Sequence, residues 1–333
     1  KVAGQKKFSS KDLNPLEMVD QVYRIGNTVH VGFTAEGKPI PQLYKGGRIP
    51  RSSSYNMGKM SILKAIENSS NPYFSLLASE FLESPEELLH AARTFSYGAK
   101  TGIELPAEIP GQMPTDLDTN KTGLYAVAIG QHTLVVTPLQ TAVMLSALAN
   151  GGQILKPQII CLKASKAPLR ENSAPFMQEN VNKVTPEVQW TAFLPDPIRR
   201  TLLEGMRRVV HKTINDSLWN LSKLYKDYPE AISDYLDLKN QMIGKTSTSE
   251  SLERLDMDTL RGINLYKHVW FGGIVFPQDI PQLEGDAYLA KDQYGYPELV
   301  VVVYLRFGGY GKEAAPLAAQ IVKKWREIKN KHS

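Results

Sequence analysis

Three strand-like runs decide the fold: QMIGKTSTS (residues 241–249), HVWFGGIVF (268–276) and ELVVVVYLRF (298–307). Each run has the length of a strand, and the connections between them show no pattern of a long helix. Strands that follow one another in this way usually pair with their neighbours in the chain. The runs therefore predict an antiparallel meander in the last hundred residues.

Helical patterns flank this meander. Thr137 can cap a helix that Pro138 begins and Gly151 ends, and Asp196 with Pro197 opens a second helix. Capping residues and prolines of this kind satisfy or avoid the free amides of the first turn. The expected class is α+β, an antiparallel sheet with helices on both faces.

The remaining segments carry weaker patterns. Residues 59–96 are helical in spacing, whereas residues 1–58 are rich in Gly and Pro and are expected to be mostly loops, with a short helical piece near residues 16–24. Residues 213–240 are interpreted as a helical insertion. The chain is expected to close with an amphipathic helix over residues 314–329. Its expected inward-facing residues are Leu317, Ile321, Trp325 and Ile328.

Composition sets outer limits on function. The chain has 333 residues, of which 42% are hydrophobic, enough for one large core or two smaller ones. The net charge is +5, but the basic residues are spread along the chain, so no nucleic-acid partner is expected. The single Cys161 allows no internal disulfide, and no apolar run is long enough to span a membrane. Because the chain opens on Lys1, we expect it to begin within a longer protein.

Common cofactor and metal motifs are missing. The sequence has no GxGxxG, no phosphate-binding GxxxxGK[ST] and no HExxH, and its six histidines lie far apart. A structural or catalytic zinc site needs several His or Cys ligands at close spacing. We therefore expect neither a metal nor an organic cofactor.

A serine-type constellation is what remains. Serine acylases can use lysine as the base, with the pattern S-x-x-K, then S-x-N, then K-T-G. A lysine in a desolvated, cation-rich pocket has a lowered pKa and can take a hydroxyl proton, while a second serine relays protons. A second lysine on a strand attracts a substrate carboxylate, and strand amides stabilise the oxyanion.

Two S-x-N triplets are present, Ser54-Tyr55-Asn56 and Ser69-Ser70-Asn71. Such a short pattern is expected about once by chance in a chain of this length. The first lies in a turn-rich segment, whereas the second lies between two helical patterns, where a short loop can hold side chains rigidly in a cleft. The second is the preferred candidate.

K-T-G is spelled twice, at residues 100–102 and 121–123, in segments expected to be loops. A better candidate by position is Gly244-Lys245-Thr246-Ser247-Thr248, although Ser247 stands where the pattern has Gly. This stretch opens the first strand of the meander. If that strand lies at an edge of the sheet, it can line a substrate groove.

Four blocks of the sequence resemble the transpeptidase domain of class B penicillin-binding proteins, of the elongation type similar to penicillin-binding protein 2. They are FSYGAKTGIELPAEIPGQMP (95–114), AIGQHTLVVTPLQTA (128–142), LANGG (148–152) and HVWFGGI (268–274), in the family's order. The resemblance covers nearly the whole chain. It implies the β-lactamase/transpeptidase type of fold.

The resemblance also implies roles for individual residues. Ser69 would bridge two lysines and pass protons, and Asn71 would hydrogen-bond the acyl-donor peptide. Lys245, Thr246 and Ser247 would line the pocket. The Thr248 hydroxyl would meet the carboxylate of the substrate or drug, and its backbone N–H would be one oxyanion donor.

Three positions depart from the family pattern. The only S-x-x-K, Ser61-Ile62-Leu63-Lys64, lies eight residues before Ser69 and is interpreted as a coincidence on a helix surface. We therefore expect the nucleophile upstream of Lys1, so that residues 1–333 form a transpeptidase domain lacking its N-terminal part. Ser247 and His132 each replace a family Gly, which predicts a narrower cleft.

The expected function is that of a D,D-transpeptidase, which cross-links peptidoglycan stem peptides through a serine acyl-enzyme and is inhibited by penicillin. Expected partners are stem peptides, β-lactams, a membrane glycosyltransferase and other wall-synthesis proteins. The expected location is the periplasmic face of the bacterial inner membrane, with an anchor outside this chain. A serine β-lactamase is less favoured, because no motif for a deacylating carboxylate is recognisable. A non-catalytic sensor or scaffold domain stays open.

Overall fold

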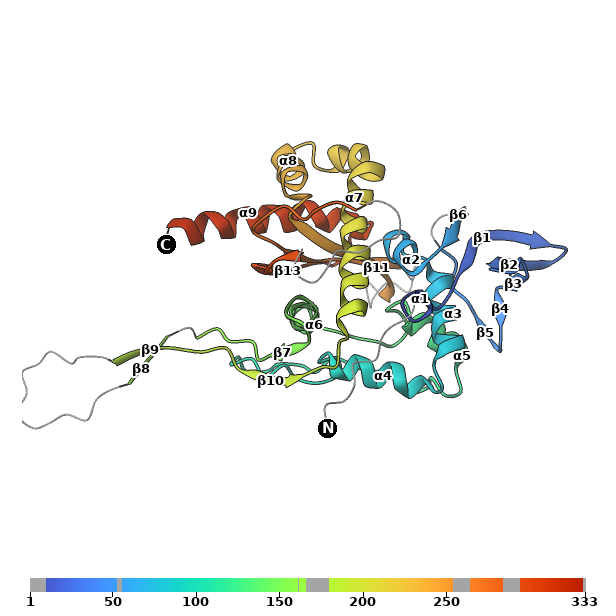
Figure 1. The fold of residues 1–333 in the computed structure, drawn as a ribbon, viewed down its shortest axis with the longest axis horizontal. Coiled ribbons are helices and arrows are strands. Elements are labelled where there is room, and N and C mark those ends of the chain that lie inside the picture. Colours follow the sequence, from blue (N-terminus) through green and yellow to red (C-terminus); the bar gives the residue numbers. More distant parts are fainter. Residues whose placement is uncertain are drawn as a thin grey trace, which may run out of the picture.

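The computed structural model describes residues 10–52, 56–160, 162–165, 180–253, 264–283 and 294–331. In these residues two groups of packed elements can be distinguished (Figure 1). We call residues 18–127 the N-terminal lobe, and the C-terminal sheet with its covering helices the sheet lobe. None of the described helices is both long and apolar enough to cross a membrane.

The sheet lobe contains the predicted meander. Its strands are β11 (Met242–Glu253), β12 (Asn264–Val275) and β13 (Leu299–Leu305), all antiparallel and in the order β11-β12-β13. Ser247 pairs with Trp270, and Trp270 pairs with Tyr304. The meander prediction is confirmed, and β11 lies at one edge of this sheet.

Helices cover both faces of this sheet, as expected (Figure 1). On one face, Phe271 and Val303 pack with α8 (Pro229–Leu238) and α9 (Ala315–Lys331). On the other face, Ile243 packs with α6 (Pro138–Asn150). Successive residues of a strand point to opposite faces, so the neighbours Met242 and Ile243 of β11 pack in the two different layers.

The predicted caps of α6 are present. The Thr137 hydroxyl accepts from the Gln140 N–H at 3.1 Å, and the Gln140 side chain accepts from the Thr137 N–H at 2.9 Å. Gly151 ends the helix at φ +87°, a left-handed conformation that favours glycine. The buried Gln140 amide also donates to the carbonyls of Ala99 and Pro110, each at 2.8 Å, and so ties the loop before α6 to the helix.

Helix α7 (Asp196–Leu224) connects the lobes. Gly205 lies against Ile66 of α2 (Ile62–Asn68), where an added Cβ would come within 2.8 Å of that side chain. The sequence predicted a helical insertion at residues 213–240, and residues 213–224 and 229–238 are helical. However, residues 213–224 continue α7 without a break, and α8 follows as part of the core.

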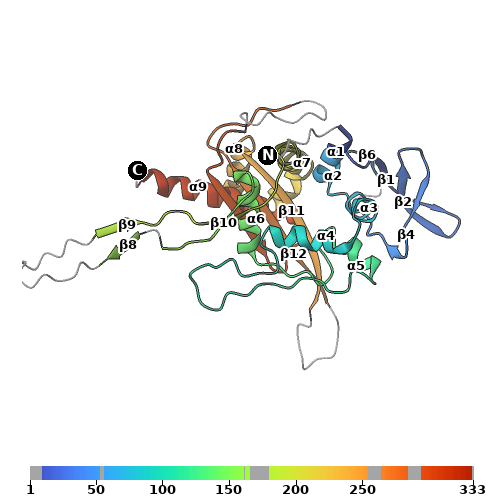
Figure 2. The same cartoon turned by 60° about the horizontal axis from the view of Figure 1, so that its bottom comes forward.

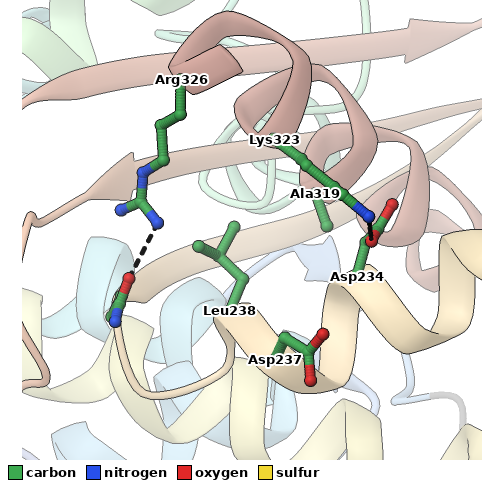
Figure 3. Close-up of a pocket in the computed structure, with 7 residues that line it drawn as sticks. Asp234, Asp237, Leu238, Ala319, Lys323 and Arg326 are labelled. Atoms are coloured by element: carbon green, nitrogen blue, oxygen red, sulfur yellow. Dashed lines mark hydrogen bonds and ion pairs between the residues drawn. The ribbon is translucent and has the colours of Figure 1, made fainter. Parts of the chain in front are cut away.

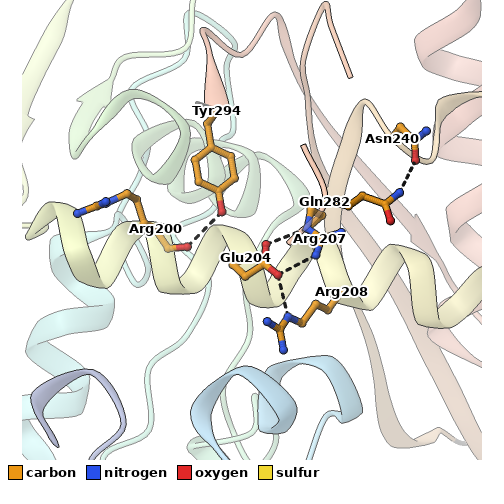
Figure 4. Close-up of polar contacts among 7 residues, drawn as sticks. All are labelled: Arg200, Glu204, Arg207, Arg208, Asn240, Gln282 and Tyr294. Carbon is orange, nitrogen blue, oxygen red and sulfur yellow. Dashed lines mark hydrogen bonds and ion pairs between the residues drawn. The ribbon is translucent and has the colours of Figure 1, made fainter. Parts of the chain in front are cut away.

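A buried ion cluster lies on α7 (Figure 4). The fully buried Glu204 accepts from the Nε atoms of Arg207 and Arg208, each at 2.8 Å. One turn earlier the Arg200 carbonyl accepts from the Tyr294 hydroxyl at 3.4 Å. Charge pairing of this kind compensates the desolvation of a buried carboxylate. The cluster therefore allows α7 to run through the interior.

The loop assignment is wrong for most of residues 18–48, which form strands. The segment near residues 16–24 is the strand β1, with Met18 and Asp20 buried and Val19 between them less so. The Val and Tyr residues of this segment favour a strand, and the turn at Gly26-Asn27 leads directly into the next one. The strands are β1 (Met18–Ile25), β2 (Thr28–Thr34), β3 (Pro39–Pro41), β4 (Leu43–Tyr44), β5 (Gly47–Arg48) and β6 (Asn56–Met60).

The four-stranded sheet β3-β2-β1-β6 packs with the helices of the N-terminal lobe. These helices are α2, α3 (Asn71–Phe81), α4 (Pro85–Thr94) and α5 (Lys121–Val127). Outside both lobes, β7 (Gln153–Leu155) pairs with β10 (Val188–Thr191), and β8 (Leu162–Ser165) pairs with β9 (Asn180–Lys183). The pair β8–β9 projects away from the rest of the described chain (Figure 2).

The inward face predicted for the closing helix is wrong in part. Ile321 and Ile328 are each 49% exposed, whereas Ala318, Ala319 and Val322 are buried against the sheet. Together with the buried Ala315, these residues recur at the three- and four-residue spacing of one helix face, which is not the predicted face. Small side chains let α9 approach the sheet closely, so close packing, rather than side-chain size, selects this face.

Replacing Gly205 by Ala is expected to lower the free energy of unfolding. Overpacking against Ile66 costs about 1–3 kcal/mol, and the higher helix propensity of Ala offsets about 1 kcal/mol. Urea denaturation measures the difference. Asn215→Ala, at an exposed position of the same helix, is the matched control and should not destabilise. In a double-mutant cycle, Gly205→Ala combined with Ile66→Ala should lose less stability than the sum of the two single losses; a stable Gly205→Ala variant would contradict close α2–α7 packing.

Candidate active site

The preferred S-x-N triplet forms the junction between α2 and α3. Ser69 ends α2 in the left-handed conformation, with φ +53° and ψ +52°, and Ser70 caps α3 by accepting from the Tyr73 N–H at 3.3 Å. Asn71 is the first residue of α3. A non-glycine residue in this conformation costs of order 1 kcal/mol. The turn leaves the Ser69 side chain exposed while Ser70 is buried.

Lys245 brings the sheet lobe to this turn. It lies on β11, two residues after Ile243, so the two side chains point to the same face of the sheet, the α6 side. Its ammonium donates to the Ser69 hydroxyl and, at 2.7 Å, to the Thr246 carbonyl. The two residues predicted as the proton relay are therefore in contact, although 176 positions separate them in the chain.

The surroundings of Lys245 change its acidity. Burial lowers its pKa from the ordinary 10.5 to about 8. The side chain is half-buried, and among the described residues no carboxylate pairs with its ammonium. A lysine with a pKa near 8 holds its proton loosely enough to exchange it with a neighbouring hydroxyl.

The S-x-N turn is held by hydrogen bonds to residues that sequence reasoning missed. Asp20 of β1 accepts from the hydroxyls of Ser52 and Ser70, each at 2.6 Å. Ser52 in turn accepts from the Asn71 N–H at 3.2 Å, and the Asn71 side-chain amide donates to the Arg51 carbonyl at 2.8 Å. No short motif links these positions, because Asp20 lies in the segment that was interpreted as turns and helix.

The strand beyond Lys245 is held in place from two sides. The Thr248 carbonyl accepts from the Gln131 side chain at 3.1 Å, and the Thr248 hydroxyl accepts from the Gly311 N–H at 2.9 Å. Gly311 packs so tightly on the Ser247 backbone that a Cβ would lie 2.4 Å from the Ser247 carbonyl oxygen. The Ser247 side chain is exposed. The substrate roles of Asn71, Thr246, Ser247 and Thr248 stay predictions.

The competing motifs have structural roles. Ser61 caps α2, and its hydroxyl accepts from the Lys64 N–H at 3.4 Å. It lies at the opposite end of this helix from Ser69, about 12 Å away at 1.5 Å per residue. The Thr101 hydroxyl donates to Glu108, so the first literal K-T-G stabilises a loop. The Thr122 hydroxyl accepts from the Arg48 N–H, so the second connects the start of α5 to β5. Ser54 lies outside the described residues.

His132 adopts the left-handed conformation, with φ +70°, at the position where the family pattern has Gly. Its ring pairs with Asp116 at 2.8 Å, and this contact, followed by that of Asn120, lowers the pKa of the Asp116 carboxyl. The pair anchors a strained backbone directly next to Gln131. His132 thus lies beside the loop that holds β11, and the expected narrowing of the cleft stays a prediction.

A cavity of about 290 Å³ lies between α8 and α9, away from this site (Figure 3). Lys323 of α9 bonds Asp234 of α8 across it at 2.6 Å. None of its lining residues belongs to the serine–lysine pair. Among the described residues, no group of three or more His, Cys, Asp or Glu side chains could hold a metal ion.

Comparison with known families decides the assignment. The model of the penicillin-binding protein transpeptidase domain matches residues 38–283, well over half of the chain. The chain belongs to the penicillin-binding protein transpeptidase family. The predicted resemblance is confirmed, and relatives named MrdA agree with the class B, elongation-type assignment.

Two curated relatives illustrate how much of the family this domain spans. It is 26% identical over 280 residues to the peptidoglycan D,D-transpeptidase MrdA of Haemophilus influenzae, covering 80% of this chain and 36% of the relative. It is 34% identical over 155 residues to penicillin-binding protein H of Bacillus subtilis, covering 40% of this chain and 22% of the relative. The transpeptidase domain described here therefore spans about a third of the length of the first relative.

Solved structures of the family share the fold. Penicillin-binding protein 2 of Pseudomonas aeruginosa, in complex with WCK 5153, matches with a TM-score of 0.57 and 18% identity, covering 92% of this chain and 54% of that one. Penicillin-binding protein 2 of Helicobacter pylori matches with a TM-score of 0.55 and 18% identity, covering 93% and 44%. The expected β-lactamase/transpeptidase type of fold is confirmed.

Lys245→Met is expected to stabilise this transpeptidase domain at pH 7. Below pH 8 Lys245 is charged in both states, and its burial as a cation destabilises the folded state. Above pH 10.5 it is neutral in both states, and this cost is gone. The variant's advantage in free energy of unfolding should therefore shrink as pH rises from 8 to 10.5. Urea denaturation at several pH values measures it, with the exposed Lys64→Met as the matched control. A gap that does not change with pH would contradict a lowered pKa.

Proposed function

We propose that this chain is the larger part of the catalytic domain of a peptidoglycan D,D-transpeptidase. The contact between the Lys245 ammonium and the Ser69 hydroxyl is the observation that carries the proposal. It joins the two candidate motifs that are distant in sequence, in a chain that belongs to the penicillin-binding protein transpeptidase family. The relative named a peptidoglycan D,D-transpeptidase supports the same reaction class.

The reaction divides into two acyl transfers. A serine hydroxyl attacks the carbonyl of the D-Ala-D-Ala bond, its proton leaves through the lysine–serine relay, and D-Ala departs with a proton on its amine. The amine of a neighbouring stem peptide then attacks the acyl-enzyme and restores the serine. We place the nucleophile, with its S-x-x-K, in a segment that precedes Lys1.

The described residues then have the following proposed roles. Ser69 passes the proton between Lys245 and the lysine of S-x-x-K, and a pKa near 8 suits Lys245 to this exchange. Thr246 and Thr248 on the edge strand align the donor peptide, whose terminal carboxylate is attracted by the Lys245 charge. Asn71 binds the peptide through the part of its amide that does not bond Arg51.

Partners and location follow from the same proposal. Structural neighbours include a peptidoglycan synthase complex and a complex between penicillin-binding protein 2 and MreC of Helicobacter pylori. By analogy, this domain works beside a membrane glycosyltransferase and other wall-synthesis proteins. Its location is the periplasmic face of the inner membrane, with the anchor in another part of the protein, and its other ligands are β-lactams.

A non-catalytic sensor or scaffold is the second candidate. One observation favours it: the only S-x-x-K serine of the sequence, Ser61, serves as a helix cap, so among the described residues no S-x-x-K serine lies beside Lys245. A sensor would be acylated by a β-lactam without forming cross-linked peptide. A scaffold would show neither reaction.

Fluorescent penicillin is expected to label a serine upstream of Lys1 in the full-length protein. Ser69→Ala and Lys245→Ala should each lower the acylation rate by about 10²–10⁴-fold, the usual contribution of acid–base catalysis. Mass spectrometry of the labelled peptide locates the serine, and cross-linking of a stem-peptide substrate tests the second step.

Ser61→Ala is the matched control for this experiment, because its hydroxyl only caps α2, and labelling should continue. A label on Ser61 itself would instead make α2 the nucleophile helix. Labelling without cross-linking would favour the sensor. A full-length protein that shows neither reaction would favour the scaffold.

A further inference from the structure

Asp20 is an unusual residue to find under a surface turn. It lies on β1 with 0% exposure, and its neighbours across the two adjacent strands are Gly32 and Gly58, which bring no charge to it. One carboxylate oxygen accepts both serine hydroxyls, and the other is buried without a hydrogen-bond partner. Burial raises the pKa of this carboxyl, against the opposing effect of the hydrogen bonds from Ser52 and Ser70.

Such a group is costly to the fold. An unpaired buried polar atom costs about 1–3 kcal/mol by protein mutational data, and a well-packed apolar residue of the same size is often as stable or more so. Stability alone therefore gives no reason for a carboxylate at this position. The two hydroxyls that it binds indicate another reason.

Both hydroxyls belong to the support of the S-x-N turn. Ser70 is the middle residue of the triplet and the cap of α3. Ser52 accepts from the Asn71 N–H, so it holds the third residue. Asp20 is thus hydrogen-bonded directly to Ser70 and, through the Ser52 hydroxyl, to Asn71.

Ser69, the first residue of the triplet, depends on its neighbours for its position. The Ser69 hydroxyl accepts from the Lys245 ammonium, and the Ser69 backbone is in the left-handed conformation. A residue with such a backbone keeps its direction only while the surrounding structure fixes it. Here the fixed point on the C-terminal side of Ser69 is the Asp20 carboxylate.

We propose that Asp20 is a positioning residue of the active site: its carboxylate fixes Ser70 and, through Ser52, Asn71, so that the Ser69 hydroxyl stays on the Lys245 ammonium. The inference rests on the proposed transpeptidase function for its catalytic consequence. Its structural consequence, the contact of Ser69 with Lys245, is independent of that function.

Asp20→Asn tests the proposal with little change in volume. The amide oxygen can still accept from both hydroxyls. The amide N–H₂ takes the place of the buried oxygen that has no partner, so its donors are unsatisfied, and we expect this to displace the turn. We expect the acylation rate of the full-length protein, per folded molecule, to fall at least 10-fold at unchanged pH. We also expect the pKa of Lys245 to rise from about 8 towards its ordinary value as water reaches the ammonium.

Two measurements follow these effects. Stopped-flow acylation by fluorescent penicillin over pH 6–10 gives the rate and its basic limb, and NMR of ¹³C-labelled lysine in the 333-residue chain gives the pKa of Lys245 directly. Asp234→Asn is the matched control, because Asp234 is also a buried carboxylate but pairs with Lys323 on the far side of the sheet. It should lower stability and leave both readouts unchanged.

The outcomes separate the two proposals. An unlabelled wild-type protein would refute the proposed function, while a shifted Lys245 pKa in Asp20→Asn would still support the positioning role. Wild-type acylation and an unshifted Lys245 pKa in folded Asp20→Asn would overturn it. If Asp20→Asn does not fold, Ser52→Ala takes its place, since it removes one of the two bonds. Ser52→Ala should then lower the acylation rate and raise the pKa of Lys245, and wild-type values for both would overturn the proposal.

Discussion

The contact between the Lys245 ammonium and the Ser69 hydroxyl is the interaction on which the site depends, because it joins the lobes. Lys245 belongs to an edge strand of the sheet lobe, and Ser69 belongs to a helix junction of the N-terminal lobe. Neither group reaches the other unless α2 and β11 hold their relative position to within a fraction of an ångström. Helix α7 provides that constraint, since Gly205 allows Ile66 of α2 to pack directly on the helix that also lies along β11.

Part of this arrangement was predictable from sequence. The meander, the caps of α6 and the choice of Ser69-Ser70-Asn71 over Ser54-Tyr55-Asn56 depend on local patterns, and these determine local structure well. The edge position of β11 also follows from short-range connectivity. These features allowed an imperfect K-T-G to be preferred over two literal ones, which are a loop and a helix start in the structure.

The errors have a common physical origin. Residues 18–25 form a strand that pairs with β2 directly after it and with the more distant β6, and its buried Met18 packs with helix residues further along the chain. The buried face of α9 is set by how closely alanine lets it approach the sheet, not by its largest side chains. The support of the site was missed for the same reason. Asp20 meets Ser70 across 50 residues, and no spacing rule describes that contact.

The site also concentrates unfavourable features. Ser69 has a left-handed backbone, Lys245 is a cation with a pKa lowered by burial, and Asp20 has a buried oxygen without a partner. Each costs stability, and each is compensated by the two apolar cores on either side rather than by its own contacts. The proposed exchange of protons between a lysine and serines requires that these groups keep their positions during the reaction. Groups that are held rigidly in costly positions meet that requirement, because the cost is met on folding and not during the reaction.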